Sequence, residues 1–153
     1  MGSALAVSFA LSFLHPTGNP RQIDAPAGTF LSGAEIPSSI KEVIENKCID
    51  CHSEQPRWPI YSRLAPASWL LEHDIVEARS HWNLSRWNVY SPEEQMKLLS
   101  KVGLQAKLNA MPPARYTLLH AGSKLTPTES IALYLWARTE RHRLLSAVPS
   151  TNK

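Results

Sequence analysis

Apolar residues recur at helical spacing in four stretches of the chain, and no stretch alternates apolar and polar residues as a half-buried strand would. The first stretch, "PSSIKEVIENKCIDCH", has Ser38 or Ser39 as its expected N-cap, and its apolar face comprises Ile40, Val43, Ile44 and Cys48. The second runs from Pro66 or Ala67 to about Arg79, with an apolar stripe of Trp69, Leu70, His73, Ile75 and Val76. These spacings predict two amphipathic helices.

Capping signals mark the start of two further helices. In "SPEEQMKLL", Ser91 is the expected N-cap, Pro92 takes the first helical position and Glu94 completes a capping box. The stretch "TPTESIALYLWARTERHRLL" repeats these three roles with Thr126, Pro127 and Glu129. On this last helix one face is expected to carry Ile131, Tyr134, Leu135 and Arg138, flanked by Ala132 and Trp136. The predicted fold class is therefore all-α, with about four helices.

The N-terminal part of the chain follows a different pattern. Residues 4–14, "ALAVSFALSFL", form an uncharged apolar run, which is shorter than the roughly 20 residues needed to cross a bilayer. The run matches the apolar region of a secretory signal, and "APA" at residues 25–27 offers a small-residue cleavage site. We expect residues 1–27 to be a signal peptide or, alternatively, an N-terminal anchor. Either role directs the domain out of the cytoplasm.

The length of 153 residues predicts a single domain. Between residues 15 and 36 the stretches "HPTGNP" and "DAPAG" are typical of a connecting segment, so residues 28–37 are predicted to be a linker. The helical domain is then expected to span residues 38–146, followed by a flexible tail at residues 147–153.

Composition narrows the classes of function. Twelve Pro against six Gly favour short helices joined by stiff connections. The net charge is only +3 and no Lys/Arg block with interleaved aromatics occurs, which argues against nucleic-acid binding. Five Trp in a chain of this size indicate that the fold encloses something large and flat.

The two cysteines of the chain lie three residues apart in "ENKCIDCHSEQ", and a histidine follows the second directly. At helical spacing, Cys48, Cys51 and His52 lie on one side of a turn. Two thiols one turn apart can add to the two vinyl groups on one edge of a protoporphyrin, and the next residue brings an imidazole under the iron. This is the C-x-x-C-H attachment pattern of haem c. One covalently bound haem is the predicted cofactor, with His52 as the proximal iron ligand.

Three other roles for the cysteines fit the chain less well. A structural zinc site needs four ligands, and no second Cys/His pair at tight spacing follows. A thioredoxin-type dithiol requires a βαβ context, which a helical chain lacks. A disulfide between residues three apart closes almost no loop and would stabilise little.

Met111, in "NAMPPARY", is the leading candidate for the sixth iron ligand, because two prolines stiffen the backbone directly after it. A thioether ligand stabilises ferrous iron and suits electron transfer. The alternatives are that Met111 only packs against the ring edge, or that His81 reaches the distal side. Other candidates are expected to serve structure: Met96 and His73 on helices, His120 in a loop hydrogen bond, and His142 in the basic end of the last helix.

The aromatic residues are numerous enough to cover a porphyrin and still fill a core. We expect haem contacts from Trp58, Tyr61, Trp69, Trp87 and Tyr116, with Trp82 as a further member of this set. Arg57 or Arg63 could neutralise the haem propionates. Trp136, on the last helix, is expected to pack helix on helix.

These features resemble those of c-type cytochromes and, more narrowly, those of the haem-binding-domain family of small exported monohaem proteins. The resemblance covers roughly residues 38–137 and is carried by "CIDCHS", "RWPIYSRLAPASWLLEHDIVEAR", "HWNLSRW", "MPPARYTLLHAGSKLTPTE" and "LYLW". It implies a cytochrome c-like helical bundle around one haem. Family members often carry Phe and Glu within the segment that here reads "NLSRW", so Leu84 and Arg86 depart from the family, and the change from Glu to Arg reverses a charge near the expected haem rim.

The expected function is a monohaem c-type cytochrome, exported to the periplasm, that carries single electrons between redox protein partners. We expect no stable small-molecule substrate, no nucleic acid, and at most a loose association with the membrane. An electron carrier is preferred over an enzyme. The alternatives are a haem enzyme or sensor of peroxide or gas, with His81 or Arg86 over an open distal face, and a subunit that conducts electrons within a larger complex.

Overall fold

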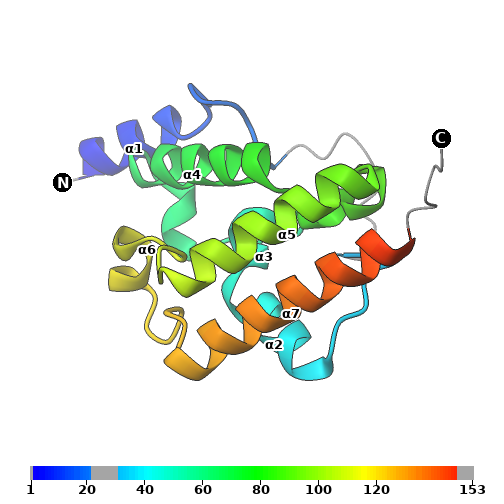
Figure 1. Cartoon of the computed structure of the whole chain (residues 1–153). Coiled ribbons are helices and arrows are strands. Elements are labelled where there is room, and N and C mark those ends of the chain that lie inside the picture. The colour runs from blue at the N-terminus through cyan, green and yellow to red at the C-terminus, as the bar shows by residue number, and fades with distance from the viewer. Residues whose placement is uncertain (1, 22–30, 148–153) are drawn as a thin grey trace. The chain divides into compact units, whose positions relative to one another are not determined.

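The computed structural model describes residues 2–21 and 31–147. Within these residues the chain contains helices and no strand, so the all-α prediction is confirmed. The elements, in chain order (Figure 1), are α1 (Gly2–Leu11), α2 (Ser38–Lys47), α3 (Ile49–His52), the 3-10 helix η1 (Ile60–Arg63), α4 (Ala67–His81), the 3-10 helix η2 (Leu84–Val89), α5 (Pro92–Lys107), α6 (Ala114–Leu119) and α7 (Pro127–Ala147).

The chain divides into two compact units. The first unit comprises residues 1–30 and 49–85, and within it α4 packs on α3 and on η1. The second comprises residues 31–48 and 86–153, and within it α7 packs on α5 and on α2. Among the described residues, no helix is long and apolar enough to cross a membrane.

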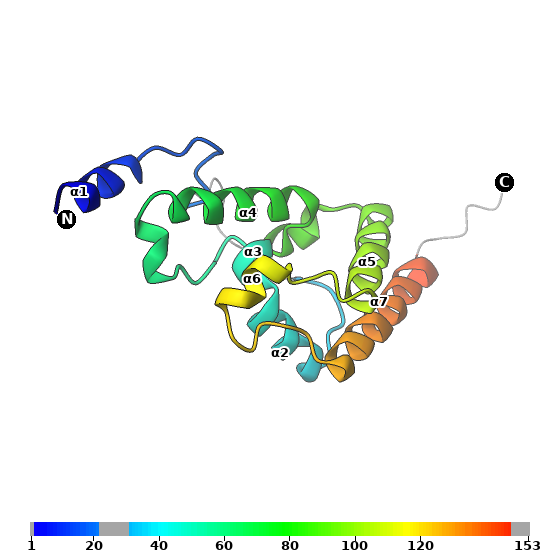
Figure 2. The same ribbon diagram turned by 90° about the vertical axis from the view of Figure 1, so that its left-hand side faces the viewer.

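In the second unit, α5 and α7 run side by side in opposite directions (Figures 1 and 2). Gly103 permits their close approach, because a Cβ at this position would lie only 3.4 Å from the ring of Tyr134. Ser130 donates a buried hydrogen bond to the carbonyl of Ala106, which ties the start of α7 to the last turn of α5. The interface is otherwise apolar and includes Leu99, Ala106, Leu133 and Ala137.

Both predicted capping boxes are present. The Ser91 hydroxyl accepts a hydrogen bond from the Glu94 N–H at 3.3 Å, and the Glu94 carboxylate accepts one from the Ser91 N–H at 2.8 Å. At the start of α7, the Glu129 carboxylate accepts from the Thr126 N–H at 2.7 Å while the Glu129 N–H donates to the Thr126 hydroxyl. Reciprocal bonds of this kind satisfy N–H groups that a helix leaves without internal partners.

The face of α7 that is buried differs from the expected one. Ile131 and Leu135 are 60% and 51% exposed, whereas the buried residues are Ser130, Leu133, Trp136, Ala137 and Glu140. The face grouped from Ile131, Tyr134, Leu135 and Arg138 is not the buried one, because polar residues of α7 are buried alongside apolar ones. Polar groups on the buried face have partners in the segment before α2: the Trp136 indole N–H donates to the Glu35 carbonyl, and the Glu140 carboxylate accepts from the Glu35 N–H.

The predicted first helix is interrupted within the cysteine motif. Ile40, Val43 and Ile44 are buried as expected. Cys48, however, has φ −124° and separates α2 from α3, so the three motif residues do not share one continuous helix. The end of α2 is fixed to the beginning of α7 by Lys47, whose ammonium group lies 2.6 Å from the Glu129 carboxylate.

The helix α4 begins at the predicted position and ends two residues beyond the expected end. Ile75 is buried as expected, but Leu70 and His73 are exposed and were wrongly placed on the inner face. Their places are taken by Ser68 and Glu72. The segment expected to be a linker is described only from residue 31, and Leu31 in it is buried. The tail was predicted to begin at residue 147, but Ala147 is the last residue of α7. The proposed cleavage site at residues 25–27 and the rest of the tail, residues 148–153, lie outside the described residues.

Candidate functional site

The second half of the cysteine motif lies on the short helix α3, which packs on α4 within the first unit. Cys51 and His52 belong to this helix, and Cys48 precedes it. Both cysteines are reduced and half-buried. Among the described residues, no group of three or more His, Cys, Asp or Glu side chains could hold a metal ion.

His52 is oriented by a backbone acceptor on the segment that follows α4. Its Nδ1 lies 3.0 Å from the carbonyl oxygen of Trp82, and its ring lies 5.8 Å from the Trp82 ring. A carbonyl can only accept, so Nδ1 carries the hydrogen and Nε2 carries the lone pair. Burial lowers the pKa of His52 and outweighs the opposing effect of hydrogen bonds to the backbone. The site therefore presents a neutral imidazole, which is the metal-binding form.

The acceptor segment is itself held by a buried polar network. The Asn83 amide donates to the Glu54 carboxylate at 3.1 Å, and Asn83 Oδ1 accepts from the Ser85 N–H at 3.0 Å. The Ser85 hydroxyl in turn accepts from the Glu54 N–H at 3.0 Å. These bonds join the residues just after His52 to the residues just after Trp82, and therefore fix the carbonyl that orients the imidazole. No side-chain pattern in the sequence indicates a backbone acceptor, so this part of the site was missed.

Charged and phenolic groups lie close to the motif. Arg57 makes a two-pronged ion pair with Asp50, with distances of 3.0 Å from Nε and 2.9 Å from the terminal nitrogen. Asp50 therefore pairs with Arg57, one of the two arginines, with Arg63, that were predicted as alternatives for neutralising the propionates. Burial raises the pKa of Tyr61, and Cys51 adds to this effect. Tyr61 thus stays protonated and can act as a hydrogen-bond donor at neutral pH.

The expected haem-contacting aromatics are found in both units. In the first unit, Trp58 is half-buried beneath the Arg21 guanidinium, and the Trp69 indole N–H donates to the Leu14 carbonyl at 2.8 Å. In the second unit, Trp87 is only 2% exposed and packs edge-on against Tyr90. Tyr116 is half-buried and stacks on His120 with ring centres 3.9 Å apart.

Met111 lies in the second unit, on the loop between α5 and α6, and is 42% exposed. His120, expected to make a hydrogen bond within a loop, instead caps the C-terminal end of α6, where its Nδ1 lies 2.9 Å from the Tyr116 carbonyl oxygen. His81 is exposed at the end of α4, and Arg86 is exposed at a kink in η2.

The donor set fits covalent attachment of a porphyrin. Two reduced thiols precede a neutral imidazole whose hydrogen is already committed to Nδ1. Large apolar side chains nearby in the first unit are also accessible to a flat apolar ligand: Ile60 and Leu64 are exposed. A soft thiol pair and one oriented imidazole are what a haem c anchor requires, whereas a hard cation requires oxygen ligands.

Comparisons with known proteins support haem binding by this chain. A family model described as "Haem-binding domain" matches residues 6–139. The chain is 24% identical over 131 residues to the cytochrome c peroxidase Ccp of Escherichia coli (strain K12). The match covers 83% of this chain and 27% of that protein, so the chain spans about a quarter of its length. No solved structure matches.

Proposed function

Because the chain belongs to the haem-binding domain family, we propose that it is a monohaem c-type cytochrome that transfers single electrons between redox protein partners. The observation that carries the proposal is the bond from His52 Nδ1 to the Trp82 carbonyl, directly behind two reduced cysteines. This bond holds the imidazole in the tautomer and orientation that metal binding requires.

In this proposal Cys48 and Cys51 would hold one haem through two thioether bonds, and His52 Nε2 would bind its iron. Each thioether would result from addition of an S–H across a vinyl double bond, which requires no oxidant. The bound haem supplies a one-electron couple at its iron. The polar network of Glu54, Asn83 and Ser85 keeps the proximal imidazole from rotating.

We propose that the aromatic side chains of the first unit that retain accessible surface, Trp58, Tyr61 and Trp69, would contact the ring. The haem contact expected for Tyr116, in the second unit, stays a prediction. Trp87 is enclosed by protein, so we assign it to packing within the second unit rather than to haem contact. Met111 is proposed as the sixth ligand, since its side chain is accessible and its loop is stiffened by the two prolines that follow.

Covalent attachment is tested by denaturing the purified, exported protein and measuring whether the haem absorbance stays with the polypeptide. We expect it to stay with the wild type and to be lost in a Cys48→Ser/Cys51→Ser variant. A colourless wild-type protein whose mass equals that of the bare chain would contradict the proposal.

The sixth ligand is tested by the absorption band near ~695 nm that marks Met–iron ligation in oxidised cytochromes. Met111→Leu should abolish this band. Met96→Leu is the matched control, because Met96 is half-buried on α5 and should leave the band unchanged. An unaltered band in Met111→Leu would reject the assignment.

A second candidate is a haem enzyme that reacts with peroxide. It is favoured by the similarity to the peroxidase, although the chain spans only about a quarter of that protein. His81 and Arg86, both exposed, are the side chains that would hold or move a proton near the substrate. Peroxide consumption by the haem-loaded protein, lost in His81→Gln, would support this candidate, and rapid carbon monoxide binding would indicate an open distal face.

The cellular setting follows from the proposed chemistry. Haem c is attached outside the bacterial cytoplasm, so we propose a periplasmic location with export directed by the apolar N-terminus. The net charge of +3 favours brief, salt-sensitive encounters with acidic redox proteins.

A further inference from the structure

The N-terminal residues 8–21 follow one stripe of α4 within the first unit (Figures 1 and 2). The α4 residues that meet them are Trp69, Glu72, Val76 and Arg79, which are spaced three or four apart and therefore lie on one face of the helix. The segment thus meets successive turns of α4 in order.

Glu72 is the central contact of this stripe. Its side chain is 1% exposed, and its carboxylate is bonded by His15 Nδ1 at 2.8 Å and by Arg21 Nε at 3.4 Å. Arg21 also donates to the Ser62 carbonyl at 2.7 Å, and its guanidinium lies 3.8 Å from the centre of the Trp58 ring. Both side-chain partners of this buried carboxylate, the imidazole of His15 and the guanidinium of Arg21, come from the N-terminal segment, so removing the segment would leave a buried carboxyl group without these partners.

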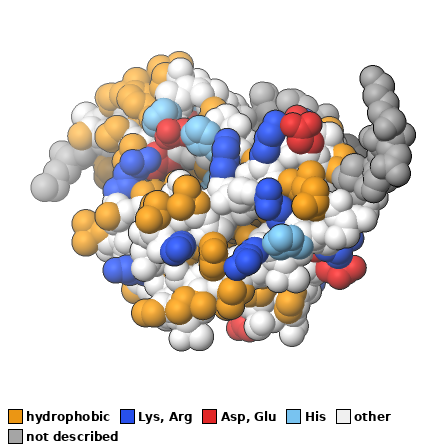
Figure 3. Space-filling view, viewed as in Figure 1, with side chains coloured by type: hydrophobic (Ala, Val, Ile, Leu, Met, Phe, Trp, Pro, Cys, Tyr) orange, Lys and Arg blue, Asp and Glu red, His pale blue; other side chains and the backbone are white. Residues whose placement is uncertain are grey.

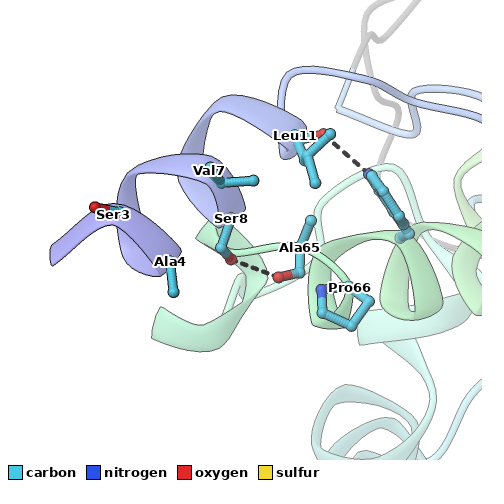
Figure 4. Close-up of a pocket in the computed structure, with 8 residues that line it drawn as sticks. Ser3, Ala4, Val7, Ser8, Leu11, Ala65 and Pro66 are labelled. Atoms are coloured by element: carbon cyan, nitrogen blue, oxygen red, sulfur yellow. Dashed lines mark hydrogen bonds between the residues drawn. The ribbon is translucent and has the colours of Figure 1, made fainter. Parts of the chain in front are cut away.

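The other polar groups of the stripe depend on the same segment. Besides the indole N–H of Trp69, which donates to the Leu14 carbonyl, Arg79 donates to the Pro20 carbonyl at 2.8 Å. At the start of α4, Ser8 donates to the carbonyl of Ala65 (Figure 4). A cut at residues 25–27 would remove every one of these partners. The family match, which begins at residue 6, includes the segment as well.

We propose that residues 8–21 stay in the mature protein as an integral part of the first unit, and that α1, which they hold in place, is a permanent lipid-binding helix rather than a leader that is removed. The proposal is independent of haem attachment.

A lipid bilayer is the occupant that fits α1. Residues 2–14 carry no charge, and exposed apolar side chains occur on α1 (Leu5, Val7, Phe9 and Leu11) and just beyond its end (Phe13 and Leu14). Figure 3 shows hydrophobic side chains gathered over α1. Residues of α1 line a pocket together with Ala65 and Pro66, which precede α4, and Trp69 of α4 (Figure 4). Because the exposed side chains of α1 listed here are apolar and uncharged, they suit a hydrocarbon environment.

The size of α1 also argues against a protein partner. Ten residues make a helix about 15 Å long. Such a helix offers a few hundred Å² at most, well below the roughly 800 Å² per partner of a stable protein interface. Insertion into lipid has no such minimum area, because each buried apolar side chain contributes independently.

Retention is tested by the intact mass of the haem-loaded protein isolated from an exporting host without an added leader. We expect residues 8–21 to be present. A mass that lacks all or part of this segment overturns the proposal, whether or not haem is attached. If the segment is present and the protein colourless, the proposed function fails while this inference stands.

Lipid binding is tested by flotation with vesicles of phosphatidylcholine and phosphatidylglycerol. A Phe9→Gln/Phe13→Gln variant should lower the vesicle-bound fraction at least about tenfold, because two exposed apolar rings are lost. Leu70→Gln is the matched control, since Leu70 is an exposed apolar residue on α4, and it should float like the wild type. Equal flotation of the Phe9→Gln/Phe13→Gln variant and the wild type overturns the proposal, as does a wild-type dimer that this variant abolishes.

Discussion

Two buried glutamates, one in each unit, hold an earlier stretch of the chain on a long helix by different means. Glu140 on α7 accepts two hydrogen bonds from Arg143, one turn further along the same helix, and one from the Glu35 N–H. Glu72 on α4 is paired with His15 and Arg21, which lie 57 and 51 residues earlier in the chain. The first carboxylate is neutralised locally, and the second is neutralised by a distant segment.

Because of this difference, the two segments contribute differently to the stability of the fold. If residues 31–36 left α7, Glu140 would still be paired with Arg143. If residues 15–21 left α4, Glu72 would lose both partners while its position stayed fixed by the helix. A buried carboxylate without a partner costs several kcal/mol, so the N-terminal segment is required for stability in a way that the segment before α2 is not.

The largest loss of stability is expected from replacing both side-chain partners of Glu72. A His15→Ala/Arg21→Met variant should lose about 3–5 kcal/mol of unfolding free energy, measured by chemical denaturation of the haem-loaded protein. Adding Glu72→Leu should restore most of this loss, because the unpaired charge is then gone. A triple variant as unstable as the double variant would show that the segment contributes through packing alone. It would contradict the difference drawn between the pairing of Glu72 and that of Glu140.

A smaller loss is expected from Arg143→Met. Glu140 keeps the bond from the Glu35 N–H, and one face of Arg143 is open to solvent, so we expect a loss of about 2 kcal/mol. Arg141→Met, at the exposed position two residues before, is the control and should stay within about 0.5 kcal/mol of the wild type. A loss as large as that of the His15→Ala/Arg21→Met variant would contradict the distinction between local and distant pairing.

The smallest effect is expected at Glu129, a partly exposed carboxylate on the same helix as Glu140. Burial alone would raise its pKa, but the bonds to Lys47 and Thr126 outweigh burial and lower it below the ordinary value near 4.5. Since the folded-state pKa is the lower one, the stabilisation is present above about pH 4.5 and is lost as the pH falls through the folded-state value.

Wild type and Glu129→Gln should therefore differ by less than about 1 kcal/mol near pH 6, and the difference should shrink by pH 3. Denaturant unfolding at the two pH values measures it. A difference that grows on acidification would mean that the carboxylate is not stabilised in its charged form.

Local signals in the sequence predicted the helices well. Ser91 with Glu94 and Thr126 with Glu129 announce helix starts through bonds that span three residues, and such bonds form wherever the helix forms. The cysteine motif was recognised for the same reason, because its spacing is local. The hydrogen bonds within the first turn of a helix can be predicted without knowledge of the segments that pack against the helix.

Features that depend on distant partners were not predictable. Glu72 and Glu140 are polar but buried. Because the prediction expected apolar residues to be buried, the buried faces of α4 and α7 were predicted partly wrong. "HPTGNP" has the composition of a connection, yet it belongs to the segment that supplies the partners of Glu72. The break at Cys48 has no helix-breaking residue to announce it.

The hydrogen bond from His52 to the Trp82 carbonyl has a consequence for mutational robustness. An oxygen of the main chain exists whatever amino acid occupies position 82, and it has no ionisable proton of its own. Replacing the Trp82 indole would alter the packing around the imidazole, but the carbonyl acceptor would remain. Acidification cannot remove this acceptor, whereas it would protonate a carboxylate acceptor. The hydrogen bond that orients His52 therefore persists through substitutions at position 82 and through acidification of the acceptor's surroundings.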